Sequence, residues 1–78
     1  MPTIMRRGPY RLFFYSNEPG EPPHVHIQRD QALAKFWLSP VALAGSTRFG
    51  PRELRVLNRM VAEHREGLME TWHEYFRS

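Results

Sequence analysis

The chain of 78 residues lacks cysteine entirely, and it carries one lysine against ten arginines. Without cysteine there can be no disulfide framework and no zinc site built from thiolates. No apolar run approaches the roughly 20 residues needed to cross a bilayer, and the first residues contain no apolar segment of the kind found in signal peptides. We therefore expect a soluble protein of the cytoplasm that makes no use of a membrane.

The length allows one domain, spanning residues 1–78, with a small core. A chain this short buries only about 60% of the surface that its unfolded form exposes. Many domains of this size gain further burial against a second copy or another protein. The net charge is only +3. The arginine bias suits phosphate or carboxylate ligands, because a guanidinium can grip either with two parallel hydrogen bonds, but a genome rich in G and C would produce the same bias.

Two histidines, His24 and His26, stand one residue apart directly after a pair of prolines. The β-branched residues Val25 and Ile27 favour a strand at this point. Since side chains alternate along a strand, both imidazoles should emerge on one face and the two aliphatic side chains on the other. The histidine pair is therefore the first candidate for a functional site, in reach of a metal, a phosphate or a proton.

The whole pattern predicts an α+β fold: a small antiparallel sheet of three or four strands, followed by a long C-terminal helix packed on one face. Strands are expected at residues 10–15, 24–29, 32–38 and, as shorter candidates, 2–5 and 41–44. On the face away from the helix, Phe13 and Trp37 are too apolar to be left bare. We expect the rest of the chain, a second copy or a ligand to cover them.

The helix is expected to begin at Pro51, a residue type that suits the first helical turn, and to end near Phe76. Its apolar stripe repeats every three or four residues and comprises Leu54, Leu57, Val61, His64, Leu68, Trp72 and Tyr75. Gly67 is a candidate for a kink or a break, because glycine within a helix costs about 1 kcal/mol relative to alanine.

The charges of this helix run against its dipole. Its first half carries Arg52, Arg55 and Arg59, and its second half carries Glu63, Glu66, Glu70 and Glu74. Helix dipoles favour the reverse order, at a few tenths of a kcal/mol per exposed charge. The arrangement suits an acidic partner on the first half, or an antiparallel copy whose glutamates meet these arginines. A solvated face with internal Arg–Glu pairs is the alternative.

The histidine pair supports three interpretations. In the first, His24 and His26 are structural and hold the preceding loop, residues 16–23, against the sheet. In the second they perform ribonuclease-like acid–base chemistry, and the accompanying residues are Lys35 for phosphate charge, Tyr15 for base stacking, and Arg11 and Arg29 for phosphate binding. In the third they bind a divalent metal such as zinc, which requires a third ligand from elsewhere in the chain.

Several strings of residues together resemble a small bacterial family, the domain-of-unknown-function family numbered four-one-six-zero. They are Pro2-Thr3-Ile4, Phe14-Tyr15-Ser16-Asn17-Glu18, Gly20-Glu21-Pro22-Pro23-His24-Val25-His26, Ala34-Lys35-Phe36-Trp37-Leu38 and Trp72-His73-Glu74-Tyr75-Phe76. The resemblance implies a single-domain protein, often encoded beside another small domain in the manner of a toxin–antitoxin pair. It implies no reaction.

Three functions follow as hypotheses. The first is a toxin–antitoxin-type interaction module that acts through a protein partner or a second copy, with Phe13, Trp37, Arg52, Arg55 and Arg59 at the interface. The second is a nuclease-like or nucleic-acid-binding domain that uses the face of His24 and His26. The third is a metal-binding domain built on the same two histidines.

Overall fold

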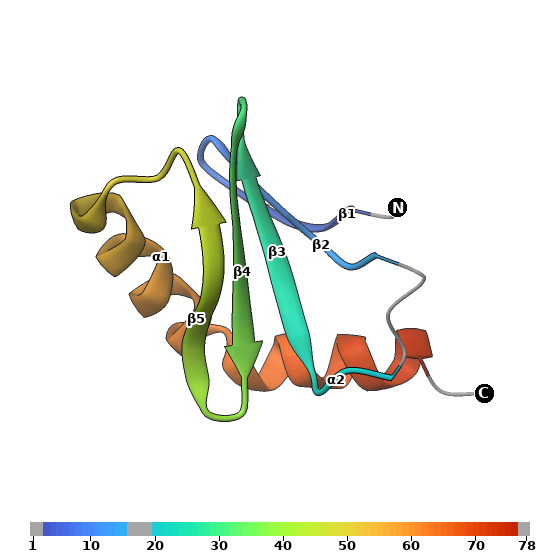
Figure 1. Cartoon of the computed structure of the whole chain (residues 1–78). Coiled ribbons are helices and arrows are strands. Elements are labelled where there is room, and N and C mark those ends of the chain that lie inside the picture. Colours follow the sequence, from blue (N-terminus) through green and yellow to red (C-terminus); the bar gives the residue numbers. More distant parts are fainter. Residues whose placement is uncertain (1–2, 16–19, 77–78) are drawn as a thin grey trace.

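The computed structural model describes residues 3–15 and 20–76. Over these residues the chain forms a five-stranded antiparallel sheet in which the strand order is the chain order (Figure 1). The strands are β1 (Thr3–Arg7), β2 (Tyr10–Phe13), β3 (His24–Arg29), β4 (Ala32–Leu38) and β5 (Val41–Thr47), and the helices are α1 (Pro51–Glu63) and α2 (Arg65–Phe76). The predicted α+β class is confirmed, but the sheet has five strands instead of three or four.

Strand β5 extends to Thr47, beyond the predicted end at residue 44. Gly45 resembles a turn signal in the sequence, but a bulge beside it lets the strand continue. Lys35 pairs with Gly45, whereas its neighbour Phe36 pairs with Leu43, so Ala44 is the additional residue in β5. An extra residue of this kind bends a strand and increases its twist without ending the pairing. The strand therefore continues to Thr47 at the edge of the sheet.

The C-terminal part is two helices, so the prediction of one long helix is wrong. The break falls at His64, whose φ of −108° and ψ of 14° leave the helical range. Immediately after it, the Arg65 guanidinium donates to the carbonyl oxygen of Leu38 at 2.7 Å. This contact fixes the start of α2 at the turn between β4 and β5. Gly67 lies inside α2, so it marks no break.

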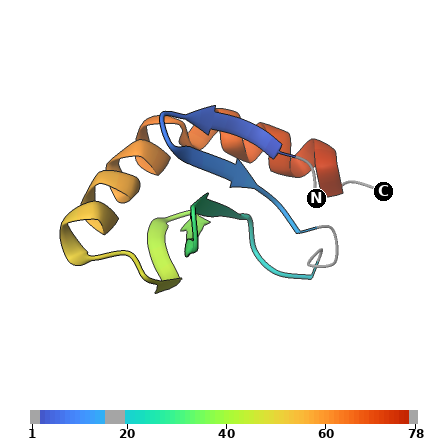
Figure 2. The ribbon, with the colours of Figure 1, turned by 90° about the horizontal axis from the view of Figure 1, so that it is seen from above.

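The core lies between one face of the sheet and the two helices, which follow one another around that side of the sheet (Figure 2). Its members come from β2, β3, β4 and both helices, with one residue directly after β2 and one before α1: Leu12, Phe14, Val25, Ile27, Ala32, Ala34, Phe36, Leu38, Phe49, Leu57, Met60, Val61, Leu68 and Trp72. The predicted helical stripe is thus largely buried, although Tyr75 remains 36% exposed. Among the described residues, neither helix is long and apolar enough to span a membrane.

Candidate functional site

The two histidines of β3 share the face of the sheet that the helices do not cover. Their ring centroids lie 5.1 Å apart with perpendicular planes, while Val25 and Ile27 point into the core. The predicted alternation is therefore confirmed. What the sequence does not predict is burial: His24 is 0% exposed and His26 is 5% exposed.

His24 is tied to the residues that precede its strand. Its Nδ1 lies 2.9 Å from the carbonyl oxygen of Pro22, and since a carbonyl can only accept, Nδ1 must carry the proton and donate it. A carboxylate oxygen of Glu21 lies 3.8 Å from the same nitrogen. The Trp37 ring packs edge-on against the imidazole at 5.9 Å. This geometry matches the structural interpretation, in which the imidazole holds the preceding loop on the sheet.

His26 packs between aromatic rings. It stacks on Phe13 with centroids 5.5 Å apart, and Tyr15 meets it edge-on at 4.4 Å. The Arg11 guanidinium lies 4.4 Å from the centroid of the Phe13 ring. These neighbours leave Phe13 only 1% exposed, so of the three covers expected for this ring the structure shows the first: the rest of the chain covers it with its own side chains.

Three of the predicted catalytic residues line a shallow hollow of about 170 Å³. Its walls are Tyr15, His26, Leu33, Ala34, Lys35, Gly45, Ser46 and Thr47. The hollow lies where Gly45 faces Lys35 across the strand pair, because glycine places no side chain there. It is smaller than the roughly 300 Å³ at which ligand pockets usually begin. The Lys35 ammonium group is engaged by the Glu21 carboxylate and lies over Trp37.

The two arginines expected to bind phosphate are committed to the fold instead. Arg11 donates to Thr3 at 2.8 Å and to Gln28 at 2.6 Å. Arg29 grips both carboxylate oxygens of Glu53, on α1, at 2.7 and 2.8 Å. Neither guanidinium lines the hollow beside His26, so the predicted cluster of histidines and phosphate-binding arginines is not assembled.

Glu53 joins α1 to the sheet through contacts that the sequence does not predict. Besides Arg29, the Tyr10 hydroxyl donates to it at 2.7 Å. The hydrogen bonds from Arg29 and then Tyr10 hold the pKa of Glu53 below its usual range, and the same carboxylate raises the pKa of Tyr10. The three residues come from β2, β3 and α1, so no local spacing could have indicated them.

Among the described residues, the histidine face does not bring together enough ligands for a metal site. In residues 3–15 and 20–76, no group of three histidine, aspartate or glutamate side chains is placed to hold a metal ion. Since a zinc site needs at least three protein ligands, His24 and His26 do not form one with the described residues.

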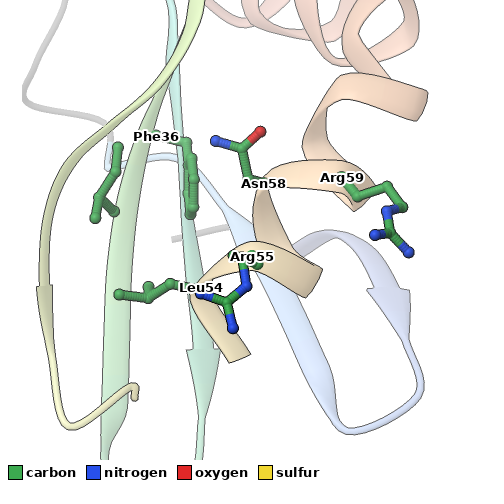
Figure 3. Close-up of a pocket in the computed structure, with 6 residues that line it drawn as sticks. Phe36, Leu54, Arg55, Asn58 and Arg59 are labelled. Carbon is green, nitrogen blue, oxygen red and sulfur yellow. The ribbon is translucent and has the colours of Figure 1, made fainter. Parts of the chain in front are cut away.

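A larger concave feature lies on the opposite face of the sheet, between α1 and the last two strands. It has a volume of about 420 Å³ and is lined by Phe36, Leu43, Leu54, Arg55, Asn58 and Arg59. Figure 3 shows Leu54 reaching from α1 toward the strands near Phe36, with Asn58 and Arg59 further along the helix. Leu43 of β5 is 41% exposed in it. We call this feature the α1–β5 groove.

The groove contains two of the three arginines predicted at an interface. Arg55 and Arg59 line it, whereas Arg52 is exposed one turn earlier on α1. Within the described part of the chain, no carboxylate or other hydrogen-bonding partner engages Arg55 or Arg59. The order of charges along the helix thus predicted the basic residues of the groove. Its apolar lining could not be predicted, because it depends on where β5 lies relative to α1.

The fold and groove define a small α+β domain with an open basic and apolar groove and a tightly packed histidine face. A family model described as Domain of unknown function (DUF4160) matches residues 10–73, and the chain belongs to this family. No curated protein and no solved structure matches the chain.

Proposed function

We propose that this protein is an interaction module of the toxin–antitoxin type, which binds an acidic, apolar segment of a partner protein in the α1–β5 groove. The observation that carries the proposal is the combination of an apolar floor with two guanidinium groups that have no partner within the described chain. The lack of cysteine suits a reducing compartment, so we place the interaction in the cytoplasm.

The floor of the groove supplies the apolar part of the binding energy. Leu43 is 41% exposed although it lies beside the core residue Phe36. Covering apolar surface contributes about 25 cal/mol per Å² removed from water, so a partner side chain that fills this space gains from Leu43 and Leu54 together. Exposed aliphatic surface inside a concavity is typical of binding sites.

The arginines supply selectivity. Arg55 and Arg59 are exposed and lie one helical turn apart on α1. Charges around an apolar contact chiefly steer association and reject partners of the wrong sign. Acidic segments should therefore be preferred over basic ones with the same apolar residues.

The nuclease-like and metal-binding alternatives have less support. Both need imidazoles that can reach a ligand, whereas His24 and His26 are at most 5% exposed. The nuclease alternative also needs arginines near the histidines, and Arg11 and Arg29 bind other parts of the chain.

The test uses a defined probe, a terminally blocked peptide of alternating valine and glutamate, with its lysine counterpart as the comparison. Binding of the acidic peptide should fall at least about tenfold in the double variant Arg55→Glu/Arg59→Glu, since each lost charge pair costs on the order of 1 kcal/mol. The matched control is Arg6→Glu/Arg7→Glu, which makes the same charge change on exposed residues of β1.

Fluorescence anisotropy with a labelled peptide measures both effects. An equal loss in the two double variants would mean that only net charge matters, and the proposal would fail. Absence of acidic-peptide binding to the unaltered protein would also refute it. Leu43→Ser should weaken binding as well, because it removes the apolar floor without changing charge.

A further inference from the structure

We propose that the acidic partner segment binds as an additional strand on the outer edge of β5, next to α1. This inference rests on the proposed function and adds the backbone conformation of the bound segment. Strand β5 is the last of the sheet and pairs with β4 alone. Its outer edge therefore presents backbone N–H and C=O groups that the described chain does not pair.

The two edges of the sheet differ in how they resist such pairing. At one edge, β1 carries the exposed residues Arg6 and Arg7, and charged side chains on an edge strand discourage pairing with other strands. At the other edge, Val41–Thr47 contains neither a charged residue nor a proline, and five of its seven residues are exposed. An exposed edge of this composition is a ready template for another strand.

The position of α1 gives an added strand something to pack against. Leu43 of β5 and Leu54 of α1 line the same groove, and Figure 1 shows α1 running alongside β5 at this end of the sheet. A strand paired with β5 would turn alternate side chains toward α1. Those side chains would meet Leu54 and the guanidinium groups of Arg55 and Arg59. Backbone pairing would provide affinity and the alternate side chains specificity, as in other peptide complexes formed by strand addition.

The bulge at Ala44 limits where pairing is regular. A bulge increases the local twist and disrupts the ladder around it. The stretch Val41–Leu43 lies before the bulge and pairs in regular register with β4. Because Leu43 also lines the groove, this stretch is where we place the first backbone contacts of the partner.

Charge favours a different protein over a second copy as the occupant. In a two-fold dimer joined by antiparallel β5 strands, the two α1 helices would lie on the same side of the combined sheet. Both α1 helices, each carrying Arg52, Arg55 and Arg59, would then lie beside the same combined edge. Like charges brought together in this way oppose association, whereas an acidic segment neutralises them.

Amide hydrogen exchange measured by NMR tests the strand geometry with the same blocked valine–glutamate peptide. At saturation, exchange should slow by about tenfold or more at alternate residues of Val41–Leu43, before the bulge, because successive backbone N–H groups of a strand point to opposite sides. The amides of Thr3–Arg7 at the other edge should be unchanged, and they serve as the internal control.

The outcomes separate this inference from the function on which it rests. If the peptide binds with the charge dependence described above but leaves exchange along β5 unchanged, the segment does not pair, and the inference is overturned while the proposed function stands. If the peptide does not bind, both fail. If the free protein sediments as a dimer with β5 already protected, a second copy occupies the edge, and the choice of an acidic partner is wrong.

Discussion

Replacement of His24 by alanine should destabilise the fold substantially. The change removes a fully buried ring and deprives the Pro22 carbonyl of its donor. Because Pro22 is exposed, water can replace the lost donor, and the hydrogen bond contributes about 0.5–1.5 kcal/mol. The cavity that the ring leaves beside Trp37 and His26 adds about 2 kcal/mol or more. With a total of about 2–4 kcal/mol, the melting temperature of a domain this small should fall by more than about 10 °C.

Thermal melts followed by circular dichroism measure this loss. His73→Ala is the matched control, because His73 is exposed on α2 and should melt within about 3 °C of the unaltered protein. His24→Asn should recover part of the loss, since an asparagine amide can donate to the Pro22 carbonyl from a similar position. A His24→Ala protein that melts within about 5 °C of the unaltered one would refute the structural role assigned to this imidazole.

Three further predictions concern the helices and turns. Because hydrogen bonds lower the pKa of Glu53 from its ordinary value of 4.5, its stabilising effect is complete above that pH and is lost as the pH falls below it. The difference in melting temperature between the unaltered protein and Glu53→Gln should therefore shrink between about pH 6 and about pH 3, and a constant difference would contradict this. Gly8→Ala should lower the free energy of unfolding by about 1 kcal/mol, since Gly8 has a φ of +57°. Gly45→Ala is the comparison: an added Cβ there meets no atom within 4 Å, so the melting temperature should be unchanged or slightly raised. Arg65→Ala should lose about 1–2 kcal/mol in denaturant titrations, because its guanidinium binds the Leu38 carbonyl, while Arg55→Ala should stay within about 0.5 kcal/mol.

Strands β3 and β4 could be predicted to the residue because their signals are local. Pro23 before β3, the alternation of histidines with β-branched residues inside β3, and the tight turn at residues 30–31 before β4 indicate both strands without reference to the rest of the chain. The end of β5 could not be predicted, since the bulge at Ala44 depends on the partner strand. The helix break at His64 likewise depends on a contact between Arg65 and the distant residue Leu38.

The candidate sites likewise combine local features that the sequence predicts with long-range contacts that it does not. The common face of His24 and His26 follows from the period of a strand, but their burial depends on which rings the neighbouring strand brings against them. Arg29 was predicted to bind phosphate because the sequence could not show Glu53, which lies 24 residues away and comes from α1. The sequence shows the basic residues of α1 directly. It does not show the groove beside them, because the groove forms between α1 and β5.

The order of the strands bears on how the protein is made. Each strand pairs with its neighbour in the chain, so the sheet can grow hairpin by hairpin, and contacts this local favour rapid folding. The helices that cover the apolar face are residues 51–76, which leave the ribosome after all five strands. Any sheet that pairs before the helices are available leaves the side chains of Leu12, Val25 and Phe36 uncovered, the kind of exposed surface on which chaperones act.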